Sequence, residues 1–137
     1  MGMAGGIDRF VSLLKDGSVE AQEYALWSLW QSTDAASKLS IAEASCSRPI
    51  INCLLKGAIH KVAQEHAAAV LCCLSDTVPG ISDELRIRNS KDIVSSGGIQ
   101  PLIKLLRAGS DGAKRYSSLA LAQLSRGDAE MQQAVTH

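Results

Sequence analysis

Apolar residues recur along this chain in closely spaced pairs that end at a glycine. Residues 10–17 and 102–109 each hold two aliphatic-rich pairs three positions apart, followed by Gly17 or Gly109. A poorer copy at residues 50–57 ends at Gly57. Such pairs fall on one stripe of a helix, and glycine commonly follows a helix end. The pattern therefore predicts three amphipathic helices, each closed by glycine.

Two further predicted helices accompany each of these copies. A longer one follows the closing glycine, at residues 18–33, 59–75 and 110–125. A shorter one comes next, at residues 34–44, 89–96 and 127–137. Residues Tyr24, His66 and Tyr116 occupy equivalent positions in the longer helices. Self-similarity at this period predicts stacked helical repeats, because one unit cannot bury its own apolar face.

The predicted repeat units cover approximately residues 5–44, 45–96 and 97–137, with incomplete units at both ends. We interpret the glycine pairs at residues 5–6 and 97–98 as helix junctions. The middle unit holds about ten additional residues, which we place in a loop at residues 76–85 because Val78-Pro79-Gly80 is typical of a turn. A longer loop of this kind is a candidate for a specific contact.

Composition and charge narrow the class of protein further. The 137 residues form one domain with 14 basic and 14 acidic side chains, so net charge does not draw it to nucleic acid or to an anionic membrane. Apolar runs are far shorter than the roughly 20 residues of a membrane span. The four cysteines lack metal-site spacing, and we expect free thiols, no cofactor, and an intracellular location, cytoplasmic or nuclear.

Catalysis is disfavoured by the placement of the reactive side chains. His66 and Cys73 lie seven residues apart on one predicted helix, about 10.5 Å of rise, which is too far for a Cys–His pair. The glycine pairs do not form a phosphate-binding loop. The basic run at residues 85–91 has no aromatic residue to stack on bases, and we expect it on the exposed side of a short helix.

The repeat resembles the armadillo repeat. The similarity lies in "GGIQPLIKLL" (97–106), "GDAEMQQAV" (127–135) and, less closely, "AQEYALWSL" (21–29). It implies an all-α, right-handed α-solenoid of about three three-helix repeats whose third helices, at 18–33, 59–75 and 110–125, line a groove. It also implies a protein or peptide partner bound along that groove.

The resemblance places candidate partner-binding residues on these third helices. The positions that carry Trp in peptide-binding relatives are Trp27, Ala69 and Leu119, and those that carry Asn are Gln31, Cys73 and Gln123. Charged residues one turn before the Trp position are Glu23, Glu65 and Arg115. Trp27 and Trp30 are three apart, and we expect Trp27 to face the groove as an anchor, although a packing role for both remains an alternative.

We therefore predict a non-catalytic scaffold or adaptor module. The alternatives are a nuclear-import-type cargo adaptor, which the loss of a regular Trp/Asn ladder disfavours, and a targeting segment of a larger enzyme such as a ubiquitin ligase. The incomplete terminal units also suggest head-to-tail self-association, with residues 127–137 of one molecule docking ahead of residues 1–10 of the next.

Overall fold

The computed structural model describes residues 3–32 and 34–136, with side chains described for residues 7–32 and 34–126. Within these ranges the chain is helical and contains no strand, so the predicted all-α class is confirmed. The described helices are α1 (Met3–Asp16), α2 (Val19–Gln31), α3 (Ala35–Glu43), α4 (Ser47–Lys56), α5 (Lys61–Ser75), α6 (Asp83–Ser95), α7 (Ile99–Ala108) and α8 (Asp111–Thr136).

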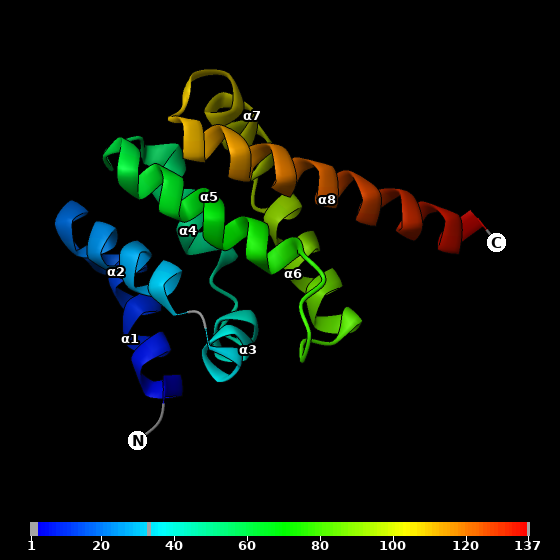
Figure 1. Ribbon diagram of the computed structural model, residues 1–137, viewed down its shortest axis with the longest axis horizontal. Coiled ribbons are helices and arrows are strands. Elements are labelled where there is room, and N and C mark those ends of the chain that lie inside the picture. The colour runs from blue at the N-terminus through cyan, green and yellow to red at the C-terminus, as the bar shows by residue number, and fades with distance from the viewer. Residues whose placement is uncertain (1–2, 33, 137) are drawn as a thin grey trace.

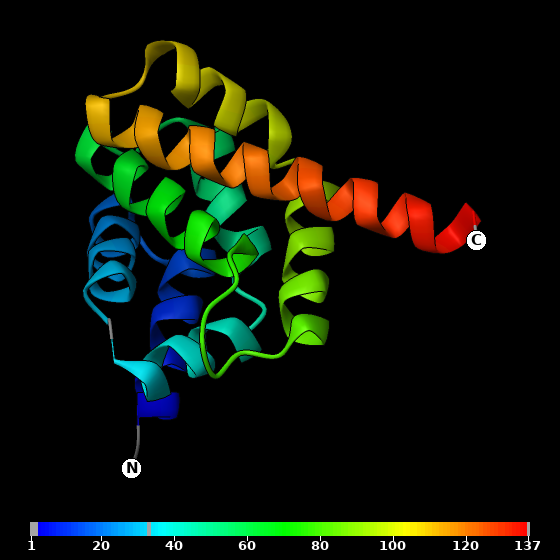
Figure 2. The same ribbon diagram turned by 45° about the vertical axis from the view of Figure 1, so that its right-hand side comes forward.

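Helices that hold equivalent places in the three predicted units pack against one another in chain order. Helix α5 contacts both α2 and α8, and the three lie side by side (Figures 1 and 2). Behind them α4 contacts both α1 and α7, while α3 contacts α6. Each predicted long helix therefore packs on the equivalent helix one unit away.

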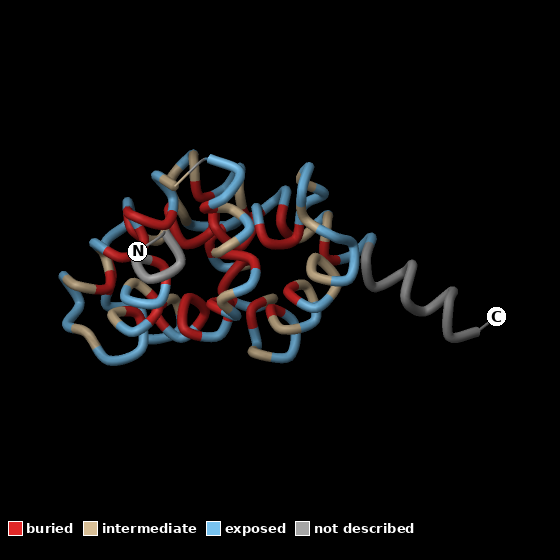
Figure 3. Tube along the Cα trace, turned by 90° about the horizontal axis from the view of Figure 1, so that it is seen from below, coloured by how far each residue is buried: buried red, intermediate tan, exposed pale blue. Residues whose placement is uncertain are grey.

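The core runs through the middle of the molecule, between these rows of helices (Figure 3). Helix α5 lies at its centre, and Ala67, Ala68 and Leu71 are fully buried there. The alanines allow α2 and α8 to approach α5 closely, because a methyl group adds little bulk between helix backbones. Leu26 and Leu102 extend the core into the neighbouring units.

Two of the three closing glycines have the same geometry. The Gly17 N–H donates to the Leu13 carbonyl at 2.8 Å, and the Gly109 N–H donates to the Leu105 carbonyl at 2.8 Å. Gly57 differs, because it ends α4 in the left-handed conformation at φ 70°. The connection from α4 to α5 (residues 57–60) is also longer than that from α1 to α2 (residues 17–18).

The structure confirms one glycine junction and corrects the other. Gly97 has φ 81°, a left-handed value that favours glycine, and the Gly98 N–H donates to the Ile93 carbonyl at 2.9 Å. The chain thereby turns from α6 into α7. The predicted junction at residues 5–6 is wrong, since α1 runs through both glycines. The chain makes no turn there, so the two glycines only lower the stability of α1 through their low helix propensity.

Helix α6 is longer than the sequence pattern predicts. It starts at Asp83, where the Ser82 hydroxyl accepts from the Leu85 N–H at 3.2 Å, so the loop is residues 76–82 and not 76–85. A serine cap followed by two acidic residues favours a helix start. The basic run within α6 is also not simply exposed, because Arg88 and Asn89 both donate to the Ala42 carbonyl, at 2.9 and 3.0 Å.

The predicted break before residue 127 is wrong. Helix α8 continues from Asp111 to Thr136 and extends past the other helices (Figure 1). Residues 128–135 are mostly good helix formers, so the single glycine at 127 costs about 1 kcal/mol and does not stop the helix. The predicted head-to-tail contact falls largely on residues whose side chains lie outside the described ranges, and it stays a prediction.

Removing a core side chain from α5 should destabilise the whole array. We expect Leu71→Ala to lower the free energy of unfolding by about 2–5 kcal/mol, because the cavity would open where α5 meets its neighbours. The control Leu55→Ala changes a side chain that is 57% exposed and should cost under about 1 kcal/mol. Urea unfolding followed by circular dichroism measures both values, and equal losses would contradict the central role of α5.

Candidate functional site

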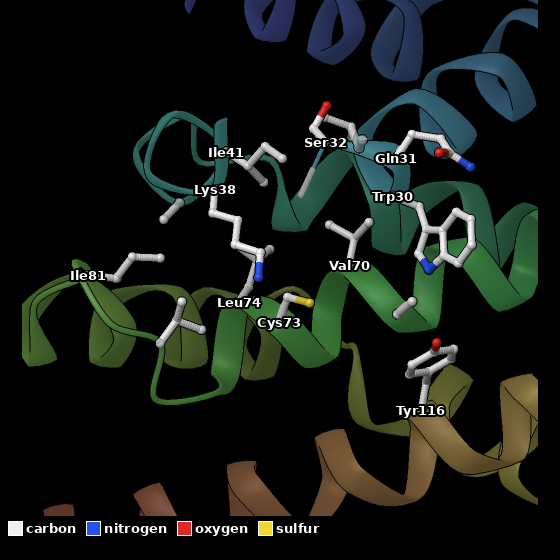
Figure 4. Close-up of a pocket in the computed structure, with 14 residues that line it drawn as sticks. Trp30, Gln31, Ser32, Lys38, Ile41, Val70, Cys73, Leu74, Ile81 and Tyr116 are labelled. Atoms are coloured by element: carbon white, nitrogen blue, oxygen red, sulfur yellow. The ribbon is translucent and has the colours of Figure 1, made fainter. Parts of the chain in front are cut away.

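A cavity opens where the C-terminal ends of α2 and α5 meet α3. Its volume is about 300 Å³, at the low end of the range for small-molecule sites, about 300–1,000 Å³. Five segments build its wall: α2, α3, α5, the loop at residues 76–82, and α8 (Figure 4). Its lining includes Trp30, Gln31, Lys38, Ile41, Cys73, Ile81 and Tyr116. We call this cavity the α2–α5 pocket.

The tryptophan that lines the α2–α5 pocket is Trp30. Its ring stacks on His66 of α5, with centroids 4.9 Å apart and an interplanar angle of 21°, while 38% of the residue stays exposed. Trp27 lies outside the pocket, 47% exposed, with its ring centroid 6.2 Å from that of Tyr24. The expectation that Trp27 anchors a partner therefore concerns a different surface from the pocket.

The loop at residues 76–82 supplies one wall of the α2–α5 pocket. Val78 and Ile81 line the cavity, and the Ile81 N–H donates to the Val78 carbonyl at 3.1 Å. This hydrogen bond closes the turn that contains Gly80. Val78 and Ile81 thus close the cavity on the side of this loop.

The structure places the sequence-predicted site residues in different surroundings. Gln31 and Cys73 both line the α2–α5 pocket. Arg115 and Leu119 lie exposed on α8, outside it. The Gln123 side chain is used internally, since its Oε1 accepts from the Ser75 hydroxyl at 2.8 Å.

Glu23 and Glu65 make equivalent contacts one unit apart. Glu23 Oε2 accepts from the backbone N–H of His60, which precedes α5, at 2.7 Å. Glu65 Oε1 accepts from the hydroxyl of Ser110, which precedes α8, at 2.9 Å, and a Cβ on Gly112 would overlap the Glu65 carboxylate. Each carboxylate lies at the start of the next long helix, where negative charge is favourable. These two residues join neighbouring units.

The thiols are free and poorly suited to nucleophilic chemistry. All four cysteines are unpaired with one another. Burial raises the pKa of Cys46 and Cys72 to about 12, and burial also raises the pKa of Cys73, against the opposing effect of Lys38. A thiol with a raised pKa stays protonated near neutral pH, and the thiolate is the nucleophile. Among the described residues there is no group of three metal-binding side chains.

Three side chains of the α2–α5 pocket could not be assigned from the sequence. Trp30 and Trp27 lie three positions apart on one helix, and only packing decides which of the two faces a given neighbour. Tyr116 aligns with His66 in the repeat, but this alignment does not assign a function to Tyr116. The sequence pattern does not indicate Lys38 as a site residue, since it belongs to a short helix outside the predicted groove.

The comparisons with known proteins support one repeat directly. Residues 1–31 match the family model described as the Armadillo/beta-catenin-like repeat, so the chain is similar to that family over α1 and α2. No curated protein and no solved structure matches the chain significantly. In the described part of the chain, no helix has both the length and the apolar character of a membrane span.

The contact between Glu65 and Ser110 should couple the middle and last units. We expect Glu65→Ala to cost about 1–2 kcal/mol of unfolding free energy, because the charge-assisted hydrogen bond is lost at a partly exposed site. In a double-mutant cycle with Ser110→Ala, the coupling energy should be about 1 kcal/mol. Additive losses in urea unfolding would show that the two side chains act independently.

His66 should make stability depend on pH near neutrality. Burial lowers the pKa of His66 from its ordinary 6.5, with Glu65 opposing the shift. The unfolded chain then binds more protons than the folded one, so the stability present above about pH 6.5 is lost as pH falls toward the lowered pKa. Unfolding free energies between pH 7.5 and 5.5 should fall in the wild type and change less in His66→Phe, which keeps a ring against Trp30. Parallel profiles would contradict this assignment.

Proposed function

We propose that the chain is a non-catalytic protein-interaction module built as a right-handed α-solenoid of armadillo-type repeats. The units are residues 5–44, 45–96 and 97–137. Three observations support the arrangement: the row α2, α5 and α8, the matching hydrogen bonds at Gly17 and Gly109, and the equivalent contacts of Glu23 and Glu65. The family similarity at residues 1–31 points the same way.

The proposed partner is a protein segment that lies along α2, α5 and α8. The observation that carries this proposal is the α2–α5 pocket, a concave apolar site on that row of helices with a half-exposed tryptophan in its wall. Large aromatic side chains beside a pocket are common anchors of protein interfaces. An apolar side chain of the partner would enter the pocket beside Trp30.

The remaining candidate residues extend the proposed contact surface. Gln31 and Cys73 form the rim of the pocket, and Arg115 and Leu119 continue along α8. Trp27 adds an exposed aromatic surface on α2. Glu23, Glu65 and Gln123 serve mainly by holding α5 and α8 in place, which keeps the surface rigid.

Peptide selection would test the proposed function with a matched pair of variants. A displayed library of random peptides is selected on the wild type, and the enriched peptides are titrated against Cys73→Arg and Val62→Arg. Both positions are exposed on α5, but only Cys73 lines the pocket. We expect Cys73→Arg to weaken binding at least tenfold and Val62→Arg to change it less than about twofold.

Trp30→Ala and Trp27→Ala then compare the two tryptophans. A loss confined to Trp30→Ala would assign the anchor to the pocket, and a loss confined to Trp27→Ala would move it to the outer face of α2. Failure to enrich any peptide, or equal binding by Cys73→Arg and the wild type, would contradict peptide binding at this site.

A further inference from the structure

The inner wall of the α2–α5 pocket is apolar on several sides. Ile41 comes from α3, Val70 and Leu74 from α5, and Val78 and Ile81 from the loop at residues 76–82. Ile81 lies at one end of the pocket, while the rings of Trp30 and Tyr116 lie at the other (Figure 4). A ligand that fills this space therefore needs an apolar part that reaches from Ile81 to the two rings.

Lys38 gives the α2–α5 pocket a single positive charge. It is the one charged side chain among the described lining residues, and it is half-buried. Its ammonium group points from α3 toward Cys73 and Leu74 (Figure 4). No ion pair of Lys38 occurs among the described residues. An anionic ligand group beside this ammonium group would form a charge-assisted hydrogen bond, which is stronger than one between neutral groups.

The helix ends around the pocket restrict where an anion can lie. The C-terminal ends of α2 and α5 both border the cavity and carry partial negative charge. Asp76, which caps the end of α5 and is exposed, adds a negative charge that acts on Cys73. These charges disfavour an anion in the cavity, but Lys38 offsets them close to its ammonium group, since its effect on the pKa of Cys73 is larger than that of Asp76. The charge pattern thus favours one anionic group next to Lys38 with its apolar chain in the rest of the cavity.

We propose that the α2–α5 pocket binds a small amphipathic monocarboxylate, such as a medium-chain fatty acid, with its carboxylate paired to Lys38. This binding goes beyond the proposed function, because the ligand is a free small molecule, and it would compete with the apolar side chain of a partner protein for the same pocket. The aliphatic chain lies against Ile41, Leu74 and Ile81, and Trp30 forms the end of the site. The loop at residues 76–82 makes such binding specific to the junction of the first two units.

Fluorescence of Trp30 provides a direct test with decanoate as the probe. The chain contains two tryptophans, so a Trp27→Phe background leaves Trp30 as the sole reporter. Decanoate, titrated below its micellar concentration, should change Trp30 emission saturably. Adding Lys38→Met should weaken decanoate binding about tenfold while keeping an apolar stem of similar length. The matched control Lys61→Met, at an exposed position on α5 outside the pocket, should bind as the background does.

Neutral and peptide probes distinguish a free fatty acid from a neutral lipid or a peptide terminus as the ligand. Methyl decanoate should bind the background and Lys38→Met with equal affinity, because it lacks the charge that Lys38 recognises. The proposal is overturned if decanoate gives no saturable change up to millimolar concentration, or if Lys38→Met binds it unchanged. It is also overturned if a short peptide ending in leucine with a free carboxylate binds over tenfold tighter than decanoate, since the natural source would then be a protein.

The peptide selection on Cys73→Arg and Val62→Arg is read separately from these titrations. If selected peptides bind and decanoate does not, the proposed interaction module is supported and the proposed small-molecule site is contradicted. Circular dichroism of every variant confirms that each is folded before titration.

Discussion

The structure depends on the burial of α5 between its neighbours. This helix contacts α2, α4, α6 and α8, and its alanine-rich middle lets the long helices on both sides approach closely. The buried side chains of α5 are covered by helices from several parts of the chain, so burial is shared among them. The pocket lies beside this packing, where the C-terminal ends of α2 and α5 meet α3.

Polar contacts set how consecutive units are joined. Glu23 and Glu65 bind the starts of α5 and α8, and Gln123 accepts from Ser75 on α5. A charged or polar side chain can make such a contact only in one arrangement of the helices. Apolar packing, in contrast, tolerates small shifts of one helix along another. The sequence pattern indicates these three residues as candidates for partner recognition, and in the structure they also make contacts between helices. They hold the long helices in the positions that shape the α2–α5 pocket.

The pocket is a local departure from the repeat. Its wall requires the additional residues of the middle unit, which place Val78 and Ile81 beside α5, and it requires Lys38 from the short α3. Equivalent positions differ in size and surroundings: Ala69 on α5 is buried and lines the pocket, whereas its counterpart Leu119 on α8 is exposed. A regular repeat would present similar surfaces at each junction. Here one junction is distinct, and both proposals concern that junction.

The sequence by itself determined the helical class and the order of the long helices, because apolar periodicity and closing glycines are local properties of the chain. It also indicated a loop of additional residues after the middle long helix, which the structure places in the wall of the pocket. It did not determine that α8 would continue through residue 127, that α6 would begin at Asp83, or that α1 would include two glycines, since each outcome depends on small differences in helix propensity and capping. Only the tertiary structure decided that Trp30, rather than Trp27, lines the pocket beside Lys38. That choice depends on the rotation of α2 against α5, and contacts between units far apart in the sequence fix this rotation.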